Sequence, residues 1–219
     1  MLEFLKEYIK HPRSVGAIAP SGQFLAQKMM EPIDFDKAKL IVEYGPGTGS
    51  FTRELVERKK PETRLVLIEH NKSFCRTLSK WLEKRGVENV RLVRASAAQA
   101  VEILASEQEA AGRVTADYVV SGLPFTSLPK KHSEEIFEAT KEILGENGEF
   151  ITFQYSMVKL RFFLDYFDLS GILRELRNVP PAYVFVLRNK AAARAAANAA
   201  DKAATAVAEA AAGIEYTGD

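Results

Sequence analysis

From about Lys39 onward, short apolar runs alternate with longer amphipathic segments, and this alternation constrains the fold more than any other feature. Short apolar runs bounded by turn residues predict buried strands, whereas apolar residues at helical spacing predict helices. The strand–helix pairs are "KLIVEYG" with "SFTRELVERKK", "TRLVLIEH" with "KSFCRTLSKWLEKRG", "NVRLVRA" with "AAQAVEILASEQEAAG", and "ADYVVSGLPF" with "KKHSEEIFEATKEILGENG". Such repeated units predict a mostly parallel sheet with helices on both faces.

The last part of this pattern differs from the rest. "EFITFQYS" predicts a fifth strand and "MVKLRFFLDYFDL" a short helix rich in aromatic residues. "ILRELRNVPPAYVFVLRN" then predicts two strands around an Asn-Val-Pro-Pro turn. Strands joined by so tight a reversal pair antiparallel. The expected fold class is therefore α/β, with a mostly parallel seven-stranded sheet that ends in an antiparallel hairpin.

Three segments are expected in the 219-residue chain, a length that suits one α/β domain. Residues 1–38 hold an amphipathic helix, the loop "HPRSVGAIAPS", and a second helix from about Gly22 to Met30 with Ser21 as its N-cap. Residues 39–190 form the α/β domain. Residues 191–219 are rich in alanine and have almost no large apolar side chain for docking, so we expect a mobile or added tail.

Charge and cysteine content restrict the class of protein further. The formal net charge is +1, with 30 basic and 29 acidic residues, so any anionic partner must be held by a local patch. The single cysteine, Cys75, excludes an internal disulfide and fits a reducing cytoplasm. Because the sequence shows neither a transmembrane-length apolar run nor a secretory signal, we expect a soluble or peripheral protein, and a monomer.

The loop "EYGPGTGS" after the first predicted strand carries three glycines at alternate positions, Gly45, Gly47 and Gly49. A dinucleotide fingerprint needs its third glycine one place later, and a phosphate loop needs a following Lys. An acid followed by this glycine spacing is instead typical of S-adenosylmethionine (SAM) loops, where the amino-acid moiety and the ribose pass close to bare backbone. An ordinary strand–helix turn is the alternative, but it rarely needs three glycines in five residues.

Two carboxylates flank this loop. Glu69 ends the second predicted strand, about twenty residues further on, where an acid accepts hydrogen bonds from ribose hydroxyls. Glu43 immediately precedes the loop and is expected to orient its amides or to contact the ammonium of SAM. At the end of the third strand, Ser96 and Gln99 are the polar groups available for the adenine.

The fourth strand ends in "SGLPF", next to the first strand across the point where strand order reverses, so this end should face the transferred methyl group. Ser121 and Leu123 are expected to line the cofactor, and Pro124 and Phe125 to form an apolar wall at the reacting atoms. A strand that simply ends in a proline is the alternative. Methyltransferases that act on adenine N6 carry Asn or Asp before the Pro-aromatic pair, and Ser121-Gly122 stands in its place.

Together, "FLKEYIKHPRSVGAIAPS", "VEYGPGTGSFT", "SGLPFTSLP", "FQYS" and "LRNVPPAYV" resemble bacterial phospholipid N-methyltransferases, relatives of the rRNA adenine dimethyltransferases. The resemblance covers about residues 1–190. It implies a Rossmann-like class I methyltransferase fold, with SAM as donor and S-adenosyl-L-homocysteine as product. It also implies successive methylation of phosphatidylethanolamine at the inner face of the membrane, with no metal ion and no nucleic acid.

The residues themselves permit a lipid substrate. The first ten residues combine one apolar face with flanking cations, as expected of a helix on an anionic bilayer or, alternatively, of a helix docked on its own domain. Aromatic side chains in the predicted last helix either line a lipid passage or belong to the core: Phe162, Phe163, Tyr166 and Phe167.

An aliphatic amine has a pKa near ~10.4 and must lose its proton before it attacks a methyl group. Tyr155, Tyr183 and His132 are the groups expected to take up that proton or to hold the amine, although His132 fits equally well as a solvated residue at a helix start. Arg177 and Asn178 beside the Pro-Pro turn are expected to hold the headgroup, together with Arg13 and Ser21 from the N-terminal segment.

Two other functions compete with lipid methylation. An rRNA adenine N6-methyltransferase would share the fold, but the balanced charge and the absent Asn or Asp disfavour it. The other is a module that binds SAM or lipid without catalysis.

Overall fold

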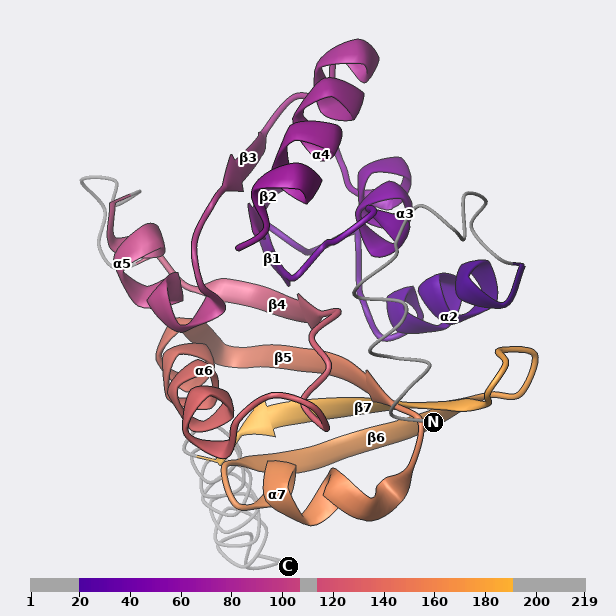
Figure 1. The fold of residues 1–219 in the computed structure, drawn as a ribbon. Helices are drawn as coiled ribbons and strands as arrows, with labels where there is room; N and C mark the ends of the chain where they lie inside the picture. Colours follow the sequence, from indigo (N-terminus) through magenta and orange to yellow (C-terminus); the bar gives the residue numbers. More distant parts are fainter. Residues whose placement is uncertain (1–19, 107–113, 191–219) are drawn as a thin grey trace, which may run out of the picture.

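The alternating segments fold into one seven-stranded sheet in the computed structural model, which describes residues 20–106 and 114–190 (Figure 1). The strands are β1 (Leu40–Tyr44), β2 (Arg64–Ile68), β3 (Val90–Val93), β4 (Ala116–Ser121), β5 (Leu144–Gln154), β6 (Phe167–Glu175) and β7 (Ala182–Asn189). Their order across the sheet is β3-β2-β1-β4-β5-β7-β6. The first five strands in this order pair in parallel, and β7 is antiparallel to both β5 and β6. This confirms the expected fold class.

Helices cover both faces of the sheet (Figure 1). The helices are α2 (Pro20–Met30), α3 (Ser50–Arg58), α4 (Lys72–Arg85), α5 (Ala100–Ala105), α6 (Lys130–Ile143) and α7 (Leu160–Leu164), with 3-10 turns η1 (Ala97–Gln99) and η2 (Met157–Lys159). Apolar residues of α5, α6 and α7 pack in one buried cluster, and those of α2, α3 and α4 in another. The sheet therefore lies between two helical layers.

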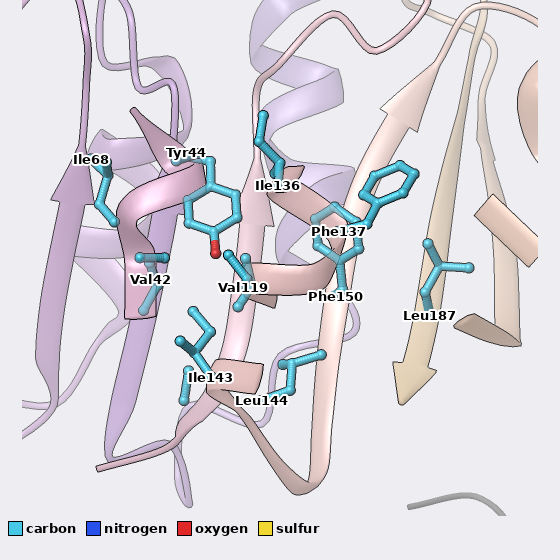
Figure 2. Packing of buried hydrophobic residues seen from close by; sticks show 14 of the residues in the cluster. Val42, Tyr44, Ile68, Val119, Ile136, Phe137, Ile143, Leu144, Phe150 and Leu187 are labelled. Atoms are coloured by element: carbon cyan, nitrogen blue, oxygen red, sulfur yellow. The ribbon is translucent and has the colours of Figure 1, made fainter. Parts of the chain in front are cut away.

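The two clusters follow from the pleat of the strands, which sends alternate side chains to opposite faces. In β1, Val42 and Tyr44 pack in the α6 cluster and Ile41 packs in the α3 cluster. Figure 2 shows Tyr44, Val119 and Phe150 from three strands together with Phe137 of α6. All five residues of β1 are buried, so this strand is covered by helices on both faces.

The predicted aromatic cluster is part of the core. Phe163 and Phe167 are fully buried, and the ring centroid of Phe163 lies 5.1 Å from that of Phe137 on α6. Phe162 and Tyr166 pack against the same cluster and are partly buried. The core alternative is therefore correct for this segment.

Several predicted boundaries were wrong. Helix α2 begins at Pro20, so Ser21 lies in the first turn and is not the N-cap; proline suits a first helical position because its missing N–H has no helical partner there. The segment "LGENG" does not continue α6. It begins β5 instead, because Leu144 is buried and a Cβ on Gly148 would lie 2.8 Å from the carbonyl oxygen of Ala116. Residues 1–19 and the alanine-rich tail lie outside the described residues.

Candidate active site

The order of strands reverses at the centre of the sheet, where β1 has β2 on one side and β4 on the other. In open α/β sheets, ligands bind at the carboxyl ends of strands at such a switch point. Tyr44 at the end of β1 is level with Ile68 of β2 and with Ser121 of β4. The loops that follow these three strands therefore begin side by side.

Each glycine of the first loop has a left-handed backbone. The φ angles are 62° at Gly45, 57° at Gly47 and 85° at Gly49, a region that side chains rarely tolerate. Space is also restricted, because a Cβ on Gly45 would lie 2.6 Å from the side chain of Leu123. The loop ends at Gly49, which is the N-cap of α3. The left-handed conformation therefore favours glycine at all three positions, and Gly45 and Gly47 leave backbone partly exposed to a ligand.

The Glu69 carboxylate joins this loop to the one after β2. It accepts hydrogen bonds from the backbone N–H of Gly47 (3.0 Å) and of Asn71 (2.7 Å) and is largely buried. Each oxygen has one of these bonds, so each keeps capacity to accept from a ribose hydroxyl. The arrangement fits the role predicted for Glu69.

The Glu43 carboxyl is fully buried beneath the glycine loop. Its Oε2 accepts a hydrogen bond from the Thr52 hydroxyl (2.8 Å), whereas Oε1 has no partner among the described residues. Burial raises the pKa of this carboxyl to about 8, and the nearby charge of Glu69 adds to the effect, while the Thr52 hydrogen bond opposes it. An unpaired buried oxygen is costly, so this atom is suited to receive a donor from a ligand or from the loop.

Ser96 and Gln99, the groups predicted near the adenine, form a capping box at η1. The Ser96 hydroxyl accepts from the N–H of Ala98 (3.2 Å), and the Gln99 side chain accepts from the N–H of Ser96 (3.2 Å). His132 of α6 lies 3.5 Å from the Ser96 hydroxyl and 3.2 Å from Glu135. Ser96 thus already has backbone and imidazole neighbours, and an adenine contact stays a prediction.

The segment after β4 packs directly on the glycine loop. The N–H of Gly122 donates to the carbonyl of Tyr44 (2.9 Å), and a Cβ on Gly122 would lie 2.8 Å from the carbonyl oxygen of Gly45. Ser121 is buried and its hydroxyl accepts from the N–H of Leu123 (3.2 Å). These contacts leave no room for a side chain at position 122.

Phe125 and Pro124 complete this turn. The Phe125 ring is buried, with its centroid 5.0 Å from that of Phe137 and 5.4 Å from that of Phe163. The carbonyl of Pro124 accepts from the N–H groups of Ser127 and Leu128. Phe125 therefore anchors the turn in the core, and the apolar wall predicted at the reacting atoms stays a prediction.

The two tyrosines predicted to handle the amine lie on opposite faces of the sheet. Tyr183 of β7 packs against the α6 cluster that contains Phe125, and the guanidinium of Arg174 lies 5.4 Å from its ring centroid. Tyr155 packs against the α3 cluster, with its ring 5.5 Å from that of Phe153. The structure therefore does not bring them together.

Two of the predicted headgroup ligands, Arg177 and Asn178, already have partners. Arg177 donates to both oxygens of Glu175 (2.9 Å each), which lowers the pKa of that carboxyl, and its guanidinium carbon lies 4.1 Å from the Phe24 ring centroid. Asn178 is buried and donates to the carbonyl of Pro180 (2.6 Å). Arg13 lies outside the described residues, and the substrate roles of all four predicted ligands, Ser21 included, stay predictions.

Two site residues were missed by the sequence reasoning. Asn71 caps α4, because its side chain accepts from the N–H groups of Ser73 and Phe74, while its own N–H holds Glu69. An asparagine just before an amphipathic helix is a recognisable N-cap signal. Thr52, the partner of Glu43, has no such signal.

The switch-point loops and the left-handed glycines define a class I SAM-dependent methyltransferase. Residues 21–138 match the family described as ribosomal RNA adenine dimethylase. An ornithine lipid N-methyltransferase from Singulisphaera acidiphila is 32% identical over 187 residues, which is 84% of this chain and 94% of that protein. The chain therefore belongs to this methyltransferase family, and the family resemblance drawn from its motifs is confirmed.

Solved structures agree on the fold. An rRNA methylase from Streptococcus thermophilus superposes with a TM-score of 0.55 at 18% identity, over 77% of this chain and 93% of that one. NSun6 from Pyrococcus horikoshii, solved with the SAM analogue SFG, superposes with a TM-score of 0.58 at 14% identity, over 77% of this chain and 51% of that one. The cofactor is SAM, and the bare glycine loop, Glu69 and the unpaired Glu43 oxygen fit it.

Replacing Glu69 tests the cofactor site. We expect Glu69→Ala to weaken SAM binding on the order of 100-fold, because it removes an anionic acceptor and releases the N–H groups of Gly47 and Asn71. Isothermal titration calorimetry measures the change, with the exposed Glu62→Ala as control. Unchanged affinity would remove Glu69 from the cofactor site.

The pKa of Glu43 predicts a pH dependence of stability without SAM. Because the folded-state pKa is raised from 4.5 to about 8, the stabilisation due to this group is complete below pH 4.5 and is lost as the pH rises to about 8. We expect Glu43→Gln to remove this loss, so that its unfolding free energy relative to wild type rises with pH by on the order of 5 kcal/mol. Urea denaturation at several pH values measures this; a pH-independent difference, like that expected for Glu62→Gln, would contradict it.

Proposed function

We propose that this protein transfers methyl groups from SAM to a primary amine carried by a membrane-lipid headgroup. The relative that shares 32% of its residues over most of both chains is described as an ornithine lipid N-methyltransferase. The motif resemblance favours phosphatidylethanolamine. Both lipids present an aliphatic amine next to an acidic group, so the common chemistry is an amine at the membrane surface.

The observation that carries this proposal is the packing of Gly122. Adenine N6 is hardly basic and needs a side-chain acceptor before the Pro-aromatic pair. At this position a Cβ would lie 2.8 Å from the backbone oxygen of Gly45, and a backbone atom of a packed loop does not move aside cheaply. The neighbouring Ser121 hydroxyl is buried and engaged with the N–H of Leu123. The site thus lacks the group that adenine methylation requires, although it matches the rRNA dimethylase family.

An aliphatic amine needs different help. Once deprotonated it is a strong nucleophile, so the protein has to accept its proton, exclude water and align nitrogen with the methyl carbon. SAM supplies an already activated methyl group. Tyr183 is the better placed of the two tyrosines, since it packs on the face that holds Phe125 and pairs with Gln154 at the carboxyl end of β5. We assign the proton-accepting role to Tyr183.

Membrane contact through the first ten residues also remains a proposal, because these residues lie outside the described ones. Among residues 20–106 and 114–190, no helix is long and apolar enough to cross a bilayer. Vesicle binding by a chain without residues 1–10 tests that contact.

Methyl transfer from labelled SAM tests the function. Vesicles that contain ornithine lipid and vesicles that contain phosphatidylethanolamine are assayed separately, with rRNA as a third acceptor. We expect label in at least one of the two lipids and none in rRNA. The two lipid arms identify the headgroup. Label in rRNA alone would overturn the proposal, and label in neither would favour a module that binds without catalysis.

Replacing the tyrosines tests the assignment of the proton acceptor. We expect Tyr183→Phe to lower kcat at neutral pH by about 100-fold or more, the usual contribution of a positioned base. Tyr155→Phe is the matched control, because it removes the same hydroxyl from the opposite face of the sheet. Equal activity of the two variants would remove Tyr183 from the proton-accepting role.

A further inference from the structure

Most large apolar side chains of the described residues are buried, and the exceptions are grouped. Six are exposed, and four of them belong to two connections: Met157 (39%) and Val158 (84%) after β5, and Leu176 (73%) and Val179 (76%) between β6 and β7. We call these four residues the apolar rim. The other two, Leu169 and Ile172, lie within β6.

The apolar rim lies along the edge of the sheet that holds the active site. Gln154 at the end of β5 pairs with Tyr183 near the start of β7, so the connection after β5 and the β6–β7 connection leave the sheet at the same edge. The parallel strands β1 and β4 also end there. In Figure 1, the β6–β7 connection projects beyond that edge, next to α2.

The β6–β7 connection is braced by polar contacts. Arg177 forms a two-fold hydrogen bond to Glu175 and stacks on Phe24 of α2, while the buried Asn178 donates to the carbonyl of Pro180. Asparagine is thus buried in this turn, whereas the aliphatic Leu176 and Val179 face solvent. Two large aliphatic side chains in one braced connection are thus exposed and available for contact with a partner.

The charge around the apolar rim narrows the kind of partner. Residues 155–161 and 174–181 contain four basic side chains, Lys159, Arg161, Arg174 and Arg177, and one acidic side chain, Glu175. That acid is neutralised by its ion pair with Arg177. Exposed aliphatic tips among cations are the composition of a surface that enters the headgroup region of an anionic bilayer. A nucleic acid would use the cations but not the aliphatic tips.

We propose that the apolar rim inserts into an anionic bilayer and holds the active-site edge of the sheet against it. A headgroup would then reach the carboxyl ends of β1 and β4 while its acyl chains stay in the membrane. The docking surface stands on its own observations. Only the delivery of substrate from the bilayer rests on the proposed function.

Vesicle co-sedimentation of the full chain tests the docking. Vesicles of phosphatidylcholine with phosphatidylglycerol should bind the Leu176→Ser, Val179→Ser double variant about tenfold more weakly than wild type, since two aliphatic side chains are lost from the contact. The control is the Leu169→Ser, Ile172→Ser double variant, which replaces two exposed aliphatic residues within β6 and should bind as wild type does. Equal melting temperatures exclude unfolding. If the rim variant binds as tightly as wild type, the proposal is overturned.

A fluorescence measurement tests the same surface without weakening it. The chain has one tryptophan, Trp81 of α4, and the guanidinium carbons of Arg53 and Arg85 lie 5.3 and 5.2 Å from its ring centroid. We expect the Val179→Trp variant to gain a blue-shifted emission that brominated lipids quench, while the wild-type emission stays unquenched. Absence of quenching from the new indole would overturn the docking.

Activity separates this proposal from the proposed function. Methyl transfer is measured on vesicle-borne amine lipid and on a short-chain, monomeric analogue. We expect the rim variant to lose about tenfold on vesicles at limiting lipid and to keep its activity on the monomer. If wild type methylates neither but still binds vesicles through the rim, the docking holds and the function fails. If the rim variant equals wild type on vesicles, the function holds and the docking fails.

Discussion

The close approach of two backbones at the centre of the sheet is the constraint on which the site depends. Gly45 begins the loop after β1 in a left-handed conformation, and Gly122 begins the segment after β4 against its carbonyl oxygen. The two strands are neighbours at the switch point, so their loops must either pack without side chains or separate. Packing them closely sets the glycine loop, brings Leu123 against Gly45, and leaves no space for a side chain at position 122.

Two carboxyl groups beside this packing are largely or fully buried, and they differ in how many hydrogen bonds they accept. Glu69 accepts two backbone N–H groups, so its charge is compensated before any ligand arrives. Glu43 accepts one hydroxyl, and its second oxygen has no partner among the described residues. Burial raises the pKa of this carboxyl to about 8. A ligand that donates a hydrogen bond to a buried, unpaired oxygen stabilises the protein more than one that contacts an oxygen already paired. An ammonium group close to Glu43 would restore its ionised form.

Local pattern predicted most of the fold. The strands followed from apolar runs, and the hairpin followed from the tight Pro-Pro turn. The site was harder to predict from the sequence, because its contacts join residues that are separated along the chain. These contacts are Gly45 with Gly122, and Glu43 with Thr52 across a loop. The faces on which Tyr155 and Tyr183 lie could not be predicted either, since the face of a strand residue depends on register.

The antiparallel hairpin links the acceptor site to the membrane in this proposal. Had β7 run parallel to β5, its entry would lie at the amino edge of the sheet, and both Tyr183 and the β6–β7 connection would be remote from the cofactor loop. Reversal brings the start of β7 level with the end of β5, as the pairing of Tyr183 with Gln154 shows. One change of strand direction therefore places Tyr183, Leu176 and Val179 along the edge that ends in the glycine loop. In this proposal the parallel strands hold the loops that bind the methyl donor, and the antiparallel hairpin determines from which surface the acceptor reaches it.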